Sequence, residues 1–225
     1  MLHLVFYRRG KRIMLEIRWH GHSCFEISNE ITLVTDPHDG KSIGIPPPLV
    51  TADVVLVSHD HFDHNSTKTV ANDHTTIVTN RKKRTVHDII IKGIQTFHDT
   101  CEGEKRGENT VFKFTIEDIT FCHLGDLGHI PNEKQLQSIG SVDLLFIPIG
   151  GTYTLDAGNA WELIKKINPK IIIPMHYKIE GLSLPLAPVD DFLSLSAFEV
   201  VKVGNQIDIE KDDLPETPEI WVFTL

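Results

Sequence analysis

The sequence contains little cysteine, no long apolar run and no excess of positive charge, and each absence excludes a class of protein. The three cysteines Cys24, Cys101 and Cys122 are odd in number and widely spaced, which predicts neither a disulfide framework nor a zinc knuckle. Their scarcity favours a reducing compartment, so we expect a cytoplasmic location. No apolar stretch approaches the ~20 residues of a membrane-spanning helix. The net charge of -9 argues against nucleic acid as a partner.

What is present is an ordinary globular composition, with 40% hydrophobic and 24% charged residues in 225 positions. This length suits one domain with a sizeable core. Residues 1–13 are basic and lack the apolar stretch of a signal peptide, so we expect an N-terminal extension of uncertain order. An alternating pattern begins at Met14 and predicts a single domain over residues 14–225.

Histidine is abundant, and its densest cluster is Ser58-His59-Asp60-His61-Phe62-Asp63-His64. It follows an apolar, β-branched run at residues 52–57 that is typical of a buried strand. Imidazole and carboxylate groups bind first-row divalent metals without thiolate help. A solvated polar turn is the alternative, but so dense a cluster behind a buried strand favours a metal site.

Other polar residues end strand-like segments further along the chain. His98 follows residues 89–97, His123 and Asp126 follow residues 119–122, and His176 follows residues 170–175. Ligands of one metal cluster usually come from several strand ends that meet at one edge, so these residues are candidates for the same site. Helices are predicted between Pro131 and Gly140 and from Asp156 to Ile167, with Asp156 as the cap. The basic run Arg81–Arg84 is predicted to be a solvated hairpin tip.

The two halves of the chain resemble each other. Asp36 and Asp53 are 53 − 36 = 17 positions apart, and Asp126 and Asp143 are 143 − 126 = 17 positions apart. In each half the first aspartate ends a strand and the second begins a buried one. This weak internal repeat predicts two sheets packed face to face with helices outside.

The His-x-His-x-Asp-His cluster resembles the signature of the metallo-β-lactamase superfamily. The resemblance spans residues 14–177 and implies an α/β fold, a four-layer αββα sandwich with an internal pseudo-repeat and metals at a shared edge of the sheets. It also implies two divalent metal ions. Zinc is the expected metal, with manganese or iron as alternatives. The implied metal ligands are His59, His61 and His98 for the first metal, Asp63, His64 and His176 for the second, and Asp126 as the bridge.

Other residues receive supporting roles. An aspartate beside such a loop often accepts a histidine N–H and fixes its tautomer, which is the role expected for Asp36. Arg106, in a glycine-containing loop, is the candidate for holding an anionic substrate group. The remaining candidates for contacts with ligands or substrate are His22, His123, Tyr153 and Tyr177.

Stretches at residues 106–109, 123–129 and 174–177 resemble the Zn-dependent hydrolases of the β-lactamase fold, a group similar to ascorbate-phosphate lactonases and phospholipase-D-like phosphodiesterases. The resemblance implies a binuclear hydrolase that uses a metal-bound hydroxide, with Asp63 and Asp126 as catalytic residues. The expected substrate is a small, possibly anionic lactone, ester or phosphodiester. Two alternatives remain: a phosphodiesterase or nuclease, and a non-hydrolytic di-iron redox protein on the same fold. The oligomeric state is not predicted.

Overall fold

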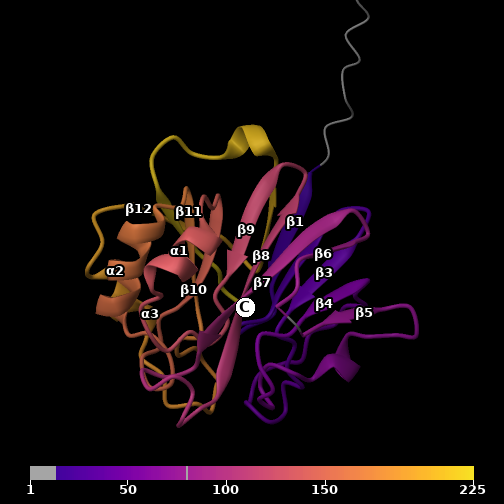
Figure 1. Cartoon of the computed structure of the whole chain (residues 1–225), viewed down its shortest axis with the longest axis horizontal. Helices are drawn as coiled ribbons and strands as arrows, with labels where there is room; N and C mark the ends of the chain where they lie inside the picture. The colour runs from indigo at the N-terminus through magenta and orange to yellow at the C-terminus, as the bar shows by residue number, and fades with distance from the viewer. Residues whose placement is uncertain (1–13, 80) are drawn as a thin grey trace, which may run out of the picture.

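The computed structural model of the chain describes residues 14–79 and 81–225, and the predicted N-terminal extension at residues 1–13 lies outside the described residues. Two sheets pack face to face (Figure 1). The first has six strands in the order β13 (Gln206–Ile209), β1 (Leu15–Trp19), β2 (Phe25–Ser28), β3 (Thr32–Thr35), β4 (Val54–Leu56) and β5 (Thr76–Val78). The second has eight strands in the order β12 (Glu199–Lys202), β14 (Glu219–Val222), β11 (Ile171–Met175), β10 (Leu144–Pro148), β9 (Ile119–His123), β8 (Glu108–Ile116), β7 (Ile89–Phe97) and β6 (Arg84–Val86).

The predicted internal repeat is visible in the strand order. β1 to β5 and β7 to β11 each run as two antiparallel pairs followed by two parallel pairs. Asp53 Oδ2 accepts the Thr32 N–H at 2.8 Å, and Asp143 Oδ2 accepts the Thr120 N–H at 2.9 Å. The two aspartates therefore tie equivalent strands together at equivalent positions.

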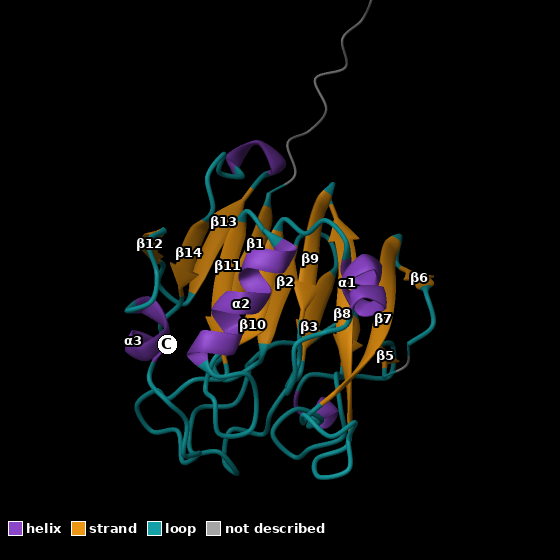
Figure 2. Ribbon diagram, turned by 60° about the vertical axis from the view of Figure 1, so that its left-hand side comes forward, coloured by secondary structure: helices purple, strands orange, loops and turns teal. Residues whose placement is uncertain are grey.

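The outer layers of the sandwich are unequal. Helices α1 (Glu133–Ile139), α2 (Ala157–Ile167) and α3 (Val189–Leu193) lie on the outer side of the eight-stranded sheet (Figure 2). Of the described residues, a loop with the 3₁₀ turn η1 (Thr67–Thr69) lies over the six-stranded sheet, and Val70 packs there against Val34 and Val55. A second 3₁₀ turn, η2 (Lys211–Asp213), follows β13. The predicted outer helix on this side is thus a single short turn.

The two long helices begin and end where their capping residues predict. Asp156 Oδ1 accepts the Asn159 N–H at 2.8 Å and caps α2, which ends at Asn168 in the left-handed conformation. A capping box between Asn132 and Gln135 begins α1, and Gly140 ends it. The predicted helix boundaries near Gly140 and Asp156 are confirmed.

The core lies between the sheets. β10 and β11 are buried at every position, as expected for parallel strands covered on both faces. Phe25 of the first sheet and Phe146 of the second meet across the interface with ring centroids 4.5 Å apart. Rigid strands therefore support the loops at their ends.

The basic run is placed differently from the prediction. Arg84 begins β6, and the hairpin turns at His87 and Asp88, which have φ values of 46° and 63°. Aspartate tolerates this left-handed conformation, which explains the turn position. Among residues 14–79 and 81–225, no helix is long and apolar enough to cross a membrane.

Candidate metal centre

The candidate site lies along the edge where the parallel strands end. Figure 2 shows the long loops gathered along one edge of the sandwich. The loops after β4, β7, β9 and β11 carry the residues that the sequence singled out. Because parallel strands place their carboxyl ends at one edge, residues far apart in sequence meet there.

Asp126 is the common neighbour of the converging histidines. Its Oδ2 lies 3.1 Å from the Nε2 atoms of His98 and His176, and 3.2 Å from that of His64. His59 Nε2 is 3.8 Å away. Two ligand atoms on one tetrahedral zinc ion are about 3.3 Å apart, given Zn–N bonds of about 2.0–2.1 Å. These separations therefore suit side chains that share metal ions.

The first group of possible ligands contains His59, His61 and His98. Ring centroids are 4.5 Å apart for His59 and His61, and 4.9 Å apart for His59 and His98. His61 is partly exposed, whereas the other two are buried. Burial lowers the pKa of His59 to about 3, which leaves its ring neutral and able to offer a lone pair.

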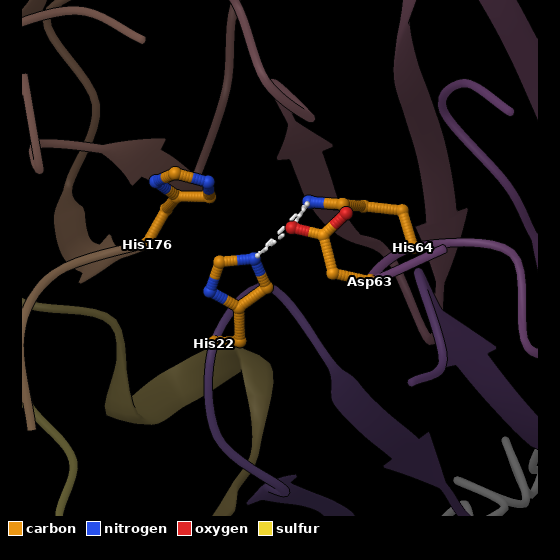
Figure 3. Close-up of side chains that lie close together, drawn as sticks. All are labelled: His22, Asp63, His64 and His176. Carbon is orange, nitrogen blue, oxygen red and sulfur yellow. Dashed lines mark hydrogen bonds and ion pairs between the residues drawn. The ribbon is translucent and has the colours of Figure 1, made fainter. Parts of the chain in front are cut away.

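The second group contains His22, Asp63, His64 and His176, whose ligand atoms all lie within 4.8 Å of one another. Figure 3 shows these four side chains close together, with Asp63 and His64 on one loop and His22 and His176 on two others. His22 Nε2 lies 3.2 Å from Asp63 Oδ2 and 3.2 Å from His64 Nε2. Burial lowers the pKa of His22 to about 3. The structure therefore brings His22 into direct contact with the implied ligands.

Asp36 determines which ring nitrogen is free in both groups. Its carboxylate accepts the Ser58 N–H at 2.7 Å and the Ser58 hydroxyl at 2.6 Å, and His64 Nδ1 lies 3.0 Å from Oδ2. Ser58 Oγ lies 2.9 Å from His59 Nδ1. Because the Ser58 hydrogen is given to Asp36, the His59 Nδ1–H must donate to Ser58. The Nε2 atoms of His59 and His64 are left to face the cluster.

The charge of the site fits a cation. Asp36, Asp63 and Asp126 are all buried, and within residues 14–79 and 81–225 their ion-pair partners are all histidines. Burial opposes protonation of His64, but the carboxylates of Asp126, Asp36 and Asp63 raise its pKa well above the usual value. Such a proton is what a metal ion displaces on binding.

Unpartnered atoms support the same fit. The buried Nε2 atoms of His59 and His176 and Oδ1 of Asp126 have no hydrogen-bond partner among the described residues. Buried polar atoms are rarely left in this state without a ligand or ion. The residues present therefore suit bound metal ions.

The polar side-chain atoms of His123 and Tyr177 form hydrogen bonds with backbone atoms. His123 Nε2 lies 3.0 Å from the Ser23 carbonyl oxygen, and its Nδ1 accepts the Gly125 N–H at 3.2 Å, so backbone engages both ring nitrogens. The Tyr177 hydroxyl donates to the Phe223 carbonyl oxygen, and the ring stacks on Trp19. The expectation that Tyr177 reaches the substrate pocket is corrected by this placement, because its ring is part of the core.

A cavity of about 380 Å³ opens beside the ligand groups. The Arg106 guanidinium carbon lies 4.5 Å from the ring centroid of Tyr153, a cation–π contact at the wall. The lining residues are four candidate ligands and four neighbouring side chains: His61, Asp63, His98, Asp126, Phe62, Arg106, Tyr153 and Leu184. Arg106 and His61 also border a second cavity of about 330 Å³.

Asp99 is a residue that the sequence analysis missed. Its Oδ1 accepts the N–H groups of Cys101 at 2.9 Å and Gly103 at 2.8 Å, and its Oδ2 accepts those of Lys105 and Arg106 at 2.9 Å each. One carboxylate thus shapes the loop that carries Arg106. An aspartate at the start of a glycine-containing loop was the available signal.

The cysteines are not among the grouped candidate ligands of the described residues. Cys24 and Cys122 are buried, Cys101 is partly buried, and all three are free thiols. Burial raises the pKa of Cys122 to about 12.

Comparison with known proteins agrees with this geometry. The model of the β-lactamase superfamily domain matches residues 16–176. A UPF0173 metal-dependent hydrolase of Thermoplasma volcanium is 31% identical over 202 residues, covering 72% of this chain and 83% of that protein. One from Thermoplasma acidophilum is 28% identical over 187 residues, covering 72% and 83%.

A solved structure extends the similarity over nearly the whole chain. It is a protein of Thermotoga maritima named as a candidate Zn-dependent hydrolase of the metallo-β-lactamase superfamily. It is 41% identical with a TM-score of 0.77, covering 93% of this chain and 98% of that one. The converging histidines and carboxylates, the two sheets and these matches together mean that the chain belongs to the β-lactamase superfamily, among its metal-dependent hydrolases.

Proposed function

We propose that the chain is a binuclear hydrolase of a small substrate with an anionic group. The observation that carries the proposal is the position of Asp126, whose Oδ2 lies within 3.2 Å of His98 from the first group and of His64 and His176 from the second. A carboxylate has two oxygens and can contact two cations at once, whereas a neutral imidazole has one free lone pair.

The two groups of side chains would hold one divalent ion each. His59, His61 and His98 would bind the first, Asp63, His64 and His176 the second, and Asp126 both. Two adjacent ions would supply a water of lowered pKa and would polarise the bond to be broken. Asp63 and Asp126 both line the cavity, so they are the carboxylates placed to orient that water.

The cavity favours a small substrate that is charged at one end and apolar at the other. Its volume of about 380 Å³ is in the range of small-molecule sites. Arg106 offers a planar, permanently charged group that suits a carboxylate or phosphate, and Tyr153 stacks beneath it. Phe62 and Leu184 supply an apolar wall. A lactone, ester or phosphodiester with an anionic substituent fits this lining.

The reaction class can be tested with the purified chain. Metal content is measured first, followed by turnover of a panel of lactones, phosphodiesters and thioesters. We expect two metal ions per chain and metal-dependent turnover of at least one class. One ion at saturation would contradict the binuclear centre. A visible-light absorption band with bound iron and no hydrolysis would favour the di-iron alternative.

The anionic group can be tested with a pair of matched substrates. Two esters with the same leaving group, one with a carboxylate substituent and one with its methyl ester, are compared in the native chain and in Arg106→Gln. We expect KM for the anionic ester to rise about tenfold, equivalent to about 1.4 kcal/mol, and KM for the neutral ester to stay unchanged. An equal change for both would contradict a charge-specific role.

A further inference from the structure

We propose that His22 is a ligand of the second metal ion, in addition to the seven residues that the family resemblance implies. The proposal rests on the proposed function only in that the site holds a metal. His22 lies in the turn between β1 and β2, far in sequence from the cluster at residues 58–64.

The separations of His22 are those of a ligand. Its Nε2 lies 3.2 Å from Asp63 Oδ2 and 3.2 Å from His64 Nε2, close to the ~3.3 Å between two donors on one ion. Its ring centroid is 4.2 Å from that of His176. In Figure 3 the His22 ring points into the space between His176 and the Asp63–His64 pair.

The other buried histidines near the site differ in one respect. His123 and His38 each have both ring nitrogens within hydrogen-bond distance of backbone atoms. Among the residues that the structure describes, His22 Nδ1 has no hydrogen-bond partner, and its Nε2 lies within hydrogen-bond distance of Asp63 and His64. His98 and His176 share the buried, unpartnered Nδ1. His22 therefore resembles the implied ligands and not the structural histidines.

The backbone holds His22 in this place. His22 has φ of 54°, a conformation that few side chains adopt readily, and its carbonyl oxygen accepts the indole N–H of Trp19 at 3.1 Å and the N–H of His176 at 3.3 Å. Gly21, the residue before it, has φ of 90°, a conformation that L side chains rarely adopt, so glycine is favoured there. The turn is thus tied directly to the strand end that carries another ligand.

An added imidazole changes the character of the second position. With Asp126, the donors become His22, Asp63, His64 and His176 plus the bridge. Five protein donors exceed the four of a tetrahedral zinc site, so this position suits an ion that accepts five or six ligands. Little room for substrate remains on that ion, so the substrate would approach the first one, beside the partly exposed His61.

The decisive measurement uses the unmodified chain. Protein with ¹⁵N-labelled histidine is loaded with ¹¹³Cd²⁺, and the imidazole rings coupled to cadmium are counted by NMR. We expect six coupled rings, the five implied histidines and His22; five rings, with the missing one assigned to His22, would overturn the proposal.

Variants give an independent measurement. His22→Asn keeps a residue that tolerates positive φ and removes Nε2, and His38→Asn is the matched control. In competition with a chromophoric chelator, we expect His22→Asn to weaken Co²⁺ binding more than about 100-fold, beyond the 10–100-fold usual for residues that only orient a ligand. The control should bind Co²⁺ as the native chain does. Unchanged affinity in folded His22→Asn overturns the proposal.

The ligand assignment and the proposed function can fail separately. Six coupled rings without turnover of any substrate would leave His22 as a ligand and count against the hydrolase. Turnover with only five coupled rings would support the hydrolase and would overturn the assignment of His22 as a ligand.

Discussion

At the residue scale, the site depends on hydrogen bonds that leave particular nitrogens free. The Asp36 carboxylate accepts hydrogen bonds from the Ser58 hydroxyl and from His64 Nδ1. The Ser58 oxygen in turn accepts one from His59 Nδ1. One buried carboxylate therefore prepares a histidine in each ligand group. Supporting residues of this kind commonly tune metal affinity without touching the ion.

Ser58→Ala tests this arrangement. Loss of the hydroxyl leaves the His59 Nδ1–H unpaired, so we expect the affinity of the first metal position to fall by about 10–100-fold. Chelator competition measures the change. Ser23→Ala is the matched control, because Ser23 is buried nearby but its hydroxyl has no hydrogen-bond partner within residues 14–79 and 81–225. Equal affinities in the two variants would contradict the tautomer argument.

Asp126 and His123 lie three positions apart and should behave differently. Asp126→Ala removes the shared carboxylate, so we expect loss of at least one metal ion and nearly all turnover. His123→Ala breaks two backbone contacts but no ligand contact, so both ions should remain, with an activity loss of at most about 10–100-fold. Metal content decides between the roles, and metal loss in the His123 variant alone would reverse the assignment.

At the element scale, the loop at residues 99–107 is held by one side chain. Burial of Asp99 opposes its ionisation, but the four N–H groups that converge on its carboxylate together keep its pKa below the usual range. Hydrogen bonds to a charged group are each stronger than neutral ones. The cavity wall formed by Arg106 depends on this arrangement.

Asp99→Asn should loosen the loop. An amide has one acceptor oxygen in place of two, so at least two of the four hydrogen bonds are lost. We expect faster amide hydrogen exchange at residues 101–106 and a higher KM for anionic substrates, with little change in metal content. Glu104→Gln removes the same charge from an exposed position of the loop and serves as the control. Unchanged exchange in Asp99→Asn would contradict the prediction.

At the scale of the whole molecule, we expect metal binding and stability to be coupled. The buried carboxylates of Asp36, Asp63 and Asp126 all lie next to His64. Burying negative charge without a cation is costly in free energy. The described part of the fold closes around this charge, so folding and metal occupancy should support each other.

A chelator should therefore lower the melting temperature. Ligand at 100 times its Kd stabilises by about 2.7 kcal/mol. For a chain of this size that corresponds to about 5–10 °C per ion. Scanning calorimetry with and without chelator measures the shift, and returning metal should restore it. The Asp126→Ala variant should respond much less, and an unchanged melting temperature in the native chain would contradict the coupling.

Local pattern was sufficient for most strands, for both long helices and for the internal repeat. The buried runs of β10 and β11, the cap at Asp156 and the equal spacing of the aspartate pairs are properties of short segments, so they can be recognised without knowing what packs against them. The thin outer layer around η1 could not be recognised, because the cover of a sheet depends on distant segments.

For the site, the sequence by itself determined the chemical types of the candidate ligands and the strand ends that carry them. Only the tertiary structure decided how the aromatic and histidine side chains between those strand ends are used: Tyr177 enters the core, His123 binds backbone, and His22 faces the ligands. The physical reason is that side-chain direction at a turn follows the backbone dihedral angles there. His22 has φ of 54°, and its carbonyl oxygen accepts a hydrogen bond from the N–H of His176, more than 150 positions away. Both features become defined only when the two sheets pack.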